Sequence, residues 1–375
     1  MKYLIAFLTL IILNSCVSPT MHQVRNGEVS PRKVIVPLWS KKLVKHQRFS
    51  QKNEEFSTPV FDKTGKRIIV GTSEGKLICF NLKGQTLWTT NLKTSINSAP
   101  LHLKQFNLII AGTIGGKLYG VDADSGKKKW KFQGYGSFLG KPVYKNGVVY
   151  ITTTRNMLYA IAVDDGSLHW SKRNETVDGY TVRGHSSPVI DGNHLFMGLS
   201  DGQILAVDLQ KRGQTLWKKA LEDPNEENYI DADADAVIKG DKLYTASYNK
   251  GLCVLDKNTG ELIWNYRAYG ITSITLHKDK IYFVSPSKGI HCLNTSGKLI
   301  WRQNIDLGTP GKIVVKGKRM IIPFDQGGII ALNPDNGFFY QRFDPGDGIS
   351  SNFAIFNNLI AALLNNGSIY LFKIT

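Results

Sequence analysis

Residues 116–130 read Gly-Lys-Leu-Tyr-Gly-Val-Asp-Ala-Asp-Ser-Gly-Lys-Lys-Lys-Trp, and this arrangement recurs along the chain. A short apolar stretch ends at Asp122, a polar turn closes at Gly126, and Trp130 follows four residues later. Asp and Gly at these positions favour a tight turn, because the Asp side chain bonds nearby amides and glycine accepts a positive φ. The stretch therefore predicts a β-hairpin with Trp130 on its second strand.

The same spacing from glycine to tryptophan occurs six times. The six pairs are Gly84/Trp88, Gly126/Trp130, Gly166/Trp170, Gly213/Trp217, Gly260/Trp264 and Gly297/Trp301. The seventh tryptophan, Trp39, lies about one period before Trp88, and successive tryptophans are 37 to 49 residues apart. A strand-rich unit with a period near 40 residues indicates a propeller or a repeat array.

A second pair of strands precedes each of these hairpins. In one repeat, Val143-Tyr is followed by a turn at Lys145-Asn-Gly147 and a β-rich run from Val148 to Thr153. Beyond the N-terminal leader, no stretch of ten or more residues shows sustained helical periodicity. We therefore expect an all-β chain in which each repeat folds as a four-stranded antiparallel propeller blade.

The two ends of the chain each carry part of a blade. The seventh turn ends at Gly337, but Gln341 stands where tryptophan is expected, and an eighth hairpin follows at 365–372. Near the start, 35–39 reads as an outer strand without a hairpin. These parts predict an eight-bladed β-propeller, closed by pairing of the N- and C-terminal strands, which removes exposed sheet edges.

The repeated tryptophans are expected to be structural. Large flat indoles are mostly buried and dominate core packing, so we interpret them as contacts between blades rather than as a cofactor site. The set is Trp39, Trp88, Trp130, Trp170, Trp217, Trp264 and Trp301.

Composition narrows the classes of function. The 375 residues carry a net charge of +17, yet aromatic residues fall in repeat positions rather than alternating with basic ones, so nucleic-acid binding is not expected. Cys79, Cys253 and Cys292 lie in strands of different repeats and read as small core residues. Neither the cysteines nor the histidines have metal-site spacing, and no metal or cofactor is predicted.

The N-terminus has the pattern of an export signal. Lys2 precedes an apolar run that ends Leu13-Asn-Ser-Cys16, which resembles a bacterial lipobox. We expect residues 1–15 to be a signal peptide, residues 16–32 to hold a lipidated Cys16 and a flexible tether, and residues 33–375 to form the propeller. A plain secretory signal is the alternative. Val17, rather than Asp, after the cysteine predicts an outer-membrane, periplasm-facing protein anchored by lipid.

Two connections between repeats are longer than the others. They follow Trp170 and Trp217, and residues 222–235 of the second carry seven acids and no base. Three interpretations stay open for this acidic stretch: a solvated charge run, a calcium loop, and a protein-docking patch. The calcium interpretation lacks the Gly and Glu that an EF-hand loop requires, since Ala236 and Lys242 stand there. In the docking interpretation, Tyr180 and Val182 are apolar anchors, and Arg183 and the aspartates orient the partner.

The repeats resemble the pyrroloquinoline-quinone-type propeller repeat over essentially the whole mature chain. Together with the lipobox, they resemble the lipoprotein family of the outer-membrane β-barrel assembly machinery. Two local motifs match that family: Tyr180-Thr-Val182-Arg183-Gly-His185-Ser, and Asp231-Ala-Asp233. Tyr180, Val182 and His185 depart from its usual residues.

The resemblance implies a non-catalytic scaffold. It would dock on the periplasmic POTRA domains of the barrel subunit through Tyr180, Val182, Arg183, Asp231 and Asp233, assist insertion of outer-membrane proteins, and contact their unfolded precursors. A quinoprotein dehydrogenase of the same fold is the alternative, although the chain lacks the adjacent cysteine pair usual in that class. A propeller that senses a ligand in its channel is a third possibility.

Overall fold

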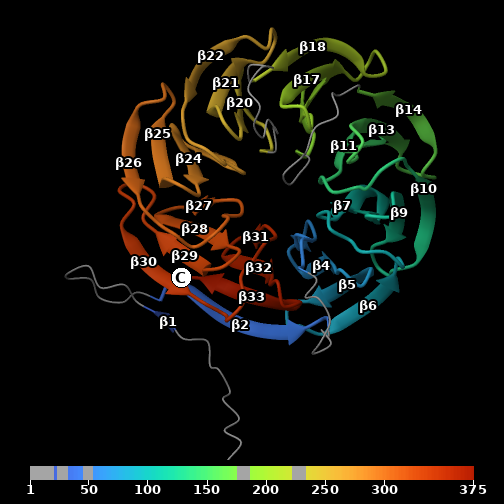
Figure 1. Cartoon of the computed structure of the whole chain (residues 1–375). Helices are drawn as coiled ribbons and strands as arrows, with labels where there is room; N and C mark the ends of the chain where they lie inside the picture. The colour runs from blue at the N-terminus through green and yellow to red at the C-terminus, as the bar shows by residue number, and fades with distance from the viewer. Residues whose placement is uncertain (1–20, 23–32, 45–53, 175–185, 222–233) are drawn as a thin grey trace, which may run out of the picture.

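Eight β-sheets surround a central axis in the computed structural model, which describes residues 21–22, 33–44, 54–174, 186–221 and 234–375 (Figure 1). The strands within each sheet are antiparallel and follow one another in chain order, except where the chain ends meet. This confirms the predicted eight-bladed propeller. Within these described residues, no helix is long and apolar enough to cross a membrane.

We number the blades 1 to 8 in chain order. Within each blade, the strands are given from the innermost outward. Blades 1 to 4 contain β3 (Val60–Phe61), β4 (Arg67–Gly71), β5 (Lys76–Asn81) and β6 (Thr86–Asn91); β7 (Leu101–Leu103), η1 (Lys104–Phe106), β8 (Leu108–Gly112), β9 (Lys117–Asp122) and β10 (Lys128–Gln133); β11 (Val143–Lys145), β12 (Val148–Thr152), β13 (Met157–Ala162) and β14 (Leu168–Arg173); β15 (Val189–Asp191), β16 (His194–Gly198), β17 (Gln203–Asp208) and β18 (Gln214–Ala220).

Blades 5 to 8 contain β19 (Val237–Lys239), β20 (Lys242–Ser247), β21 (Gly251–Asp256) and β22 (Leu262–Tyr266); β23 (Ile274–His277), β24 (Lys280–Ser285), β25 (Gly289–Asn294) and β26 (Leu299–Gln303); β27 (Val314–Lys316), β28 (Arg319–Phe324), β29 (Gly328–Leu332), β30 (Phe339–Phe343) and β1 (Met21–His22); β31 (Ala354–Phe356), β32 (Leu359–Leu363), β33 (Ser368–Ile374) and β2 (Ile35–Lys42).

Blade 8 is built from both ends of the chain. Strand β2 pairs antiparallel with β33 from Ile35↔Ile374 to Lys42↔Ser368, so the N-terminal strand supplies the outer strand of the last blade. Blade 7 departs from the expected four strands, because β1 pairs with the outer edge of β30 and adds a fifth. Two residues of the expected tether therefore lie against the propeller.

The hydrophobic core lies between neighbouring blades. In one cluster, Ile69 and Trp88 of blade 1 pack with Ile109 and Tyr119 of blade 2, and seven further such clusters continue around the ring. The two middle strands of each blade are buried on both faces, which is why they read as continuous apolar runs. Burial of this apolar surface is the main force holding the blades together.

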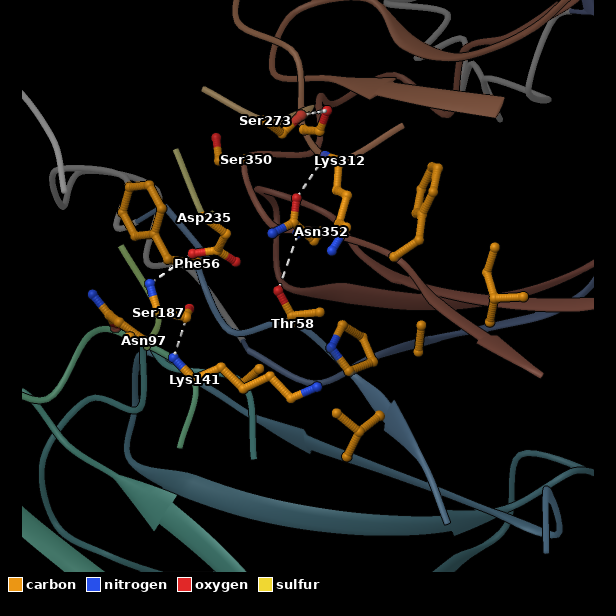
Figure 2. A pocket seen from close by; sticks show the side chains of 18 of the residues that line it. Phe56, Thr58, Asn97, Lys141, Ser187, Asp235, Ser273, Lys312, Ser350 and Asn352 are labelled. Atoms are coloured by element: carbon orange, nitrogen blue, oxygen red, sulfur yellow. Dashed lines mark hydrogen bonds between the residues drawn. The ribbon is translucent and has the colours of Figure 1, made fainter. Parts of the chain in front are cut away.

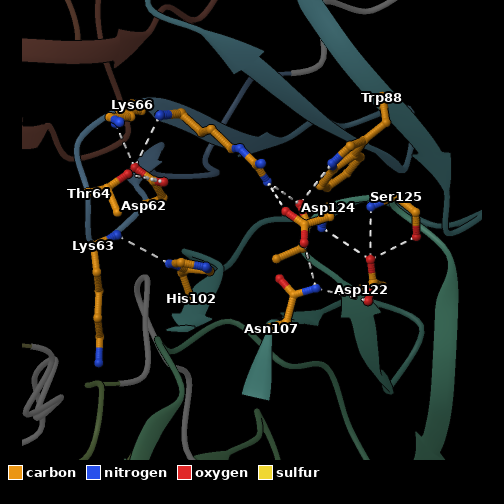
Figure 3. A network of polar contacts seen from close by, with 12 residues as sticks. Asp62, Lys63, Thr64, Lys66, Trp88, His102, Asn107, Asp122, Asp124 and Ser125 are labelled. Atoms are coloured by element: carbon orange, nitrogen blue, oxygen red, sulfur yellow. Dashed lines mark hydrogen bonds and ion pairs between the residues drawn. The ribbon is translucent and has the colours of Figure 1, made fainter. Parts of the chain in front are cut away.

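Each tryptophan contacts the turn of the next blade along the chain, not the turn that precedes it. The indole of Trp88 donates a hydrogen bond from Nε1 to the carbonyl of Ala123, 3.0 Å away (Figure 3). A Cβ atom added to Gly126 would lie 2.8 Å from the same indole. The contacts of this kind are Trp39/Gly84, Trp88/Gly126, Trp130/Gly166, Trp170/Gly213, Trp217/Gly260, Trp264/Gly297 and Trp301/Gly337.

The turn that receives Trp88 is itself held by a carboxylate. One Asp122 oxygen accepts hydrogen bonds from the amide of Ser125 at 2.9 Å and from its hydroxyl at 2.8 Å (Figure 3). These bonds stabilise the ionised form and lower the pKa of Asp122 to about 2. The aspartate that the sequence places at this turn therefore fixes the position of the glycine under the indole.

Gln341 occupies the tryptophan position of blade 7, and its contacts explain the exception. In blade 8, the N-terminal segment of the chain occupies the place where the other blades have a turn between their third and fourth strands. The buried Gln341 accepts hydrogen bonds at Oε1 from the amides of Val34 at 2.7 Å and Ile35 at 2.9 Å. Its Nε2 donates to the carbonyl of Ile35. An amide side chain thus satisfies backbone groups that a covalent turn would otherwise have satisfied.

Candidate functional site

One face of the propeller carries both long connections. Because the strands of each blade alternate in direction, the crossings between blades and the turns between second and third strands emerge on the same face. The long crossings join blade 3 to blade 4 and blade 4 to blade 5. We call this surface the crossing face. The five predicted docking residues, Tyr180, Val182, Arg183, Asp231 and Asp233, lie outside the described residues, as does Cys16.

The first long crossing starts and ends at fixed points. At its start, the buried Asn174 donates from its backbone amide and from Nδ2 to the carbonyl of Asn156, at 3.2 and 3.0 Å. At its end, the buried Ser186 hydroxyl accepts a hydrogen bond of 2.6 Å from the amide of Gly198. Both ends are therefore hydrogen-bonded to the blades.

The second long crossing ends next to the first. It starts at the buried Leu221, whose amide donates to the carbonyl of Gly202. It re-enters the propeller at the buried Ala234 and at Asp235, and the Asp235 carboxylate accepts a hydrogen bond of 2.6 Å from the amide of Ser187. The re-entry points of the two crossings are thus bonded to each other near the central axis.

Exposed apolar side chains gather on either side of these crossings. In blade 2, Ile114 lies in the turn between the middle strands and Tyr135 lies in the crossing to blade 3. In blade 5, Tyr248 and Tyr269 occupy the equivalent two positions. Tyr135 and Tyr269 each follow the blade's tryptophan by five residues and each precede a glycine with positive φ. We call these four residues the flanking pairs.

A cation lies over one ring of each flanking pair. The Arg155 guanidinium is 5.8 Å from the ring centre of Tyr135, and the Lys288 ammonium is 5.9 Å from that of Tyr269. Such contacts orient exposed aromatic rings. Tyrosine and arginine are also the residue types that most often carry binding energy in protein interfaces. The flanking pairs therefore have the chemistry of a docking surface.

The flanking pairs were not among the residues predicted from the sequence, because they lie in connections of ordinary length. A signal was present, because a Tyr-Gly dipeptide stands five and six residues after Trp130 and Trp264 only. These two repeats bracket the two long crossings, and that relation emerges once the blade order is known.

The cysteines have the environment of core residues. Cys79, Cys253 and Cys292 are buried within the blades. Burial raises the pKa of Cys79 to about 12 and that of Cys292 to about 11, so these thiols stay protonated and unreactive at neutral pH. In the described part of the chain, no three His, Cys, Asp or Glu residues lie close enough together to hold a metal ion.

Comparison with known proteins gives a consistent family. Residues 73–303 and 210–343 match the family model described as outer membrane protein assembly factor BamB. The chain is 24% identical to the protein of that name from Yersinia pestis over 77% of each chain.

Solved structures share the fold at lower identity. The crystal structure of BamB from Moraxella catarrhalis superposes with a TM-score of 0.78 and 20% identity, covering 91% of this chain and 100% of that one. A quinohemoprotein alcohol dehydrogenase from Pseudomonas putida superposes with a TM-score of 0.73 and 12% identity, covering 91% and 76%. At these identities the superpositions show a common propeller and not a common activity. Because the match to the family model covers most of its length, the chain belongs to the family of the outer membrane protein assembly factor BamB.

Proposed function

We propose that this protein is a non-catalytic scaffold that docks on the barrel subunit of the outer-membrane protein assembly machinery through its crossing face. Family membership supports the assembly role, since the relatives carry the name of assembly factors. The observation that supports the docking surface is the placement of exposed apolar side chains on both sides of the long crossings. Ile114 and Tyr135 lie on one side, and Tyr248 and Tyr269 lie on the other.

The long crossings would supply the specific contacts. We propose that Tyr180 and Val182 insert as apolar anchors, and that Arg183, Asp231 and Asp233 pair with charges on the periplasmic POTRA domains. Charged residues of this kind set orientation and association rate, while buried aromatic groups contribute most of the affinity. The hydrogen bond between Ser187 and Asp235 holds the ends of both crossings together, so the two loops would present their residues as one surface.

The membrane attachment forms part of the same proposal. Residues 1–15 would be removed, Cys16 would carry the lipid, and the propeller from residue 33 would face the periplasm from the outer membrane. Contact with unfolded outer-membrane proteins stays a prediction, because no described feature favours it.

A binding measurement tests the docking surface. The purified full-length lipoprotein would be titrated in detergent against the POTRA domains of the barrel subunit from the same cell. We expect Tyr135→Ala, Tyr269→Ala, Arg183→Ala and Asp231→Ala each to weaken binding about tenfold or more, which corresponds to about 1.4 kcal/mol or more. Leu87→Ala is the matched control, because Leu87 is equally exposed but lies on the outer strand of blade 1.

Two results would contradict the proposal. Wild-type affinity in the Tyr135 and Tyr269 variants would show that the flanking pairs are not part of the interface. Wild-type affinity in the Arg183 and Asp231 variants would show the same for the long crossings. The dehydrogenase alternative has its own test. Turnover of an alcohol with a dye acceptor, after addition of calcium and pyrroloquinoline quinone, would show that the protein is an enzyme.

A further inference from the structure

The central channel holds a cavity with an unusual set of charges. The cavity has a volume of about 650 Å³, which lies within the range of small-molecule sites. Every blade contributes to its wall the residue two positions before the start of its innermost strand. At this position blade 3 has Lys141, blade 5 has Asp235 and blade 7 has Lys312, while the other blades have uncharged residues.

Hydrogen bonds between blades fix the backbone of both lysines. The amide of Lys141 donates to the Ser187 hydroxyl at 3.0 Å, and the amide of Lys312 donates to Asn352 Oδ1 at 2.7 Å (Figure 2). The amide of Asn352 in turn donates to Thr58 Oγ1 at 3.1 Å. Each lysine is therefore anchored to the next blade through its main chain, and its side chain extends into the cavity (Figure 2).

The two lysines face each other across the axis, because blades 3 and 7 are opposite in a ring of eight. In the described residues, neither ammonium has a hydrogen bond or an ion pair within 4 Å. Burial in the channel lowers the pKa of Lys141, the charge of Lys312 lowers it further, and only Asp235 acts in the opposite direction. The wall thus brings together two like charges that repel each other.

The acids of the cavity do not neutralise this pair. Asp235 accepts the amide hydrogen of Ser187 and lies beyond ion-pair distance from Lys141. Asp62, which also lines the cavity, accepts hydrogen bonds from Thr64 and from the amides of Lys66 and Arg67 within its own turn (Figure 3). Lys63 also lines the cavity, and its ammonium donates to Gln105 Oε1 at 3.5 Å. In the described residues, the ammonium groups of Lys141 and Lys312 therefore remain as free donors, with hydroxyl and amide groups of the wall around them.

We propose that the channel is a binding site for a small oxyanion with two or more negative charges, which contacts Lys141 and Lys312 from opposite sides. Charge-assisted hydrogen bonds from two ammonium groups suit phosphate-type and polycarboxylate ligands alike. The ligand would offset the repulsion between the two ammonium groups. It would also connect the walls of two blades that are far apart in the sequence. The cavity shares Ser187 and Asp235 with the ends of the long crossings, but none of the flanking pairs lines it and the docking proposal does not use Lys141 or Lys312, so either proposal can fail without the other.

Titration calorimetry on the full-length protein in detergent tests this site. Pyrophosphate and citrate would be injected in separate experiments at constant ionic strength, and the anion that binds identifies the source chemistry. We expect one saturable site, with affinity about tenfold or more lower in Lys141→Gln and in Lys312→Gln. Asp235→Asn keeps the acceptor for Ser187 and removes a repelling charge, so it should bind the anion more tightly.

Lys131→Gln is the matched control, because it makes the same charge change on the exposed outer strand β10. It should leave the affinity unchanged. Thermal melting without anion should show Lys141→Gln and Lys312→Gln to be at least as stable as the wild type, since each relieves repulsion. Absence of saturable binding by both anions, unchanged binding in both channel variants, or an equal loss in Lys131→Gln would overturn the proposal.

Discussion

Seven of the eight junctions between blades use an indole against a glycine turn, whereas the junction between blades 7 and 8 uses Gln341 against the N-terminal segment. The seven junctions have a covalent turn to receive a flat ring. The eighth has no such turn, because blade 8 is assembled from the two ends of the chain. The comparison indicates that the repeated tryptophan depends on the turn it contacts, and that buried backbone groups at the closure, which have no turn to pair with, require a hydrogen-bonding side chain instead.

The largest expected effect comes from emptying an indole junction. Trp130 is buried between blades 2 and 3, and Nε1 donates to the carbonyl of Val163 at 2.9 Å. We expect Trp130→Ala to lower the free energy of unfolding by about 3–5 kcal/mol, measured by urea denaturation. A loss below about 1 kcal/mol would show that the indoles fill space without holding the blades together.

The closing junction should be the next most sensitive. Gln341→Ala leaves the buried amides of Val34 and Ile35 without their acceptor, at a cost of about 2–3 kcal/mol. Hydrogen exchange gives a specific readout, because protection should fall at Val34 and Ile35 but not at the turn that receives Trp130. Equal loss of protection at both places would mean that the closure has no separate stability.

A pair of glycine substitutions isolates the contact with the indole. Gly166 has φ +74° and an added Cβ would lie 2.5 Å from the Trp130 ring, whereas Gly147 has φ +80° with nothing within 4 Å. Both alanine variants carry the backbone cost of about 1 kcal/mol, and Gly166→Ala should lose about 2 kcal/mol more through overpacking. Similar midpoints in urea for the two variants would contradict the close packing.

The smallest effect concerns the indole hydrogen bond. Trp217 Nε1 donates to the carbonyl of Lys257 at 3.0 Å, but Trp264 Nε1 is buried and has no partner in the described structure. Trp217→Phe should therefore cost about 1 kcal/mol more than Trp264→Phe, because only the first leaves a carbonyl unpaired. Thermal melting of the two variants side by side measures the difference, and equal losses would assign the junction energy to packing alone.

The fold could be predicted because the same few residues recur at the same positions. The glycine and the tryptophan recur at one spacing in six blades, most often after an Asp or Asn at the start of the turn, and the partial repeats at the ends predict both the count and the closure. The turn that each indole contacts could not be predicted in the same way. A period gives the spacing between Trp88 and Gly126 but does not say which turn the indole meets, and only the arrangement of blades in a ring answers that.

The candidate sites show the same division. The length of the crossings after Trp170 and Trp217 is visible in the sequence, so a docking face could be anticipated there. Tyr135 and Tyr269 lie outside those crossings and gain meaning from the blade order. Lys141 and Lys312 are single lysines among 47 basic residues, and only closure of the ring brings them to opposite walls of one channel.

If Cys16 carries the proposed lipid, the short strand β1 would limit the distance between the propeller and the bilayer. Met21 lies on the edge of blade 7, and Cys16 precedes it by five residues, which reach at most about 18 Å when fully extended. With acyl chains on Cys16, this short segment would keep the edge of the propeller at blade 7 beside the lipid headgroups. The opposite edge, at blade 3 and next to Tyr135, would then lie farthest from the membrane in the periplasm, where partners on the periplasmic side could reach it.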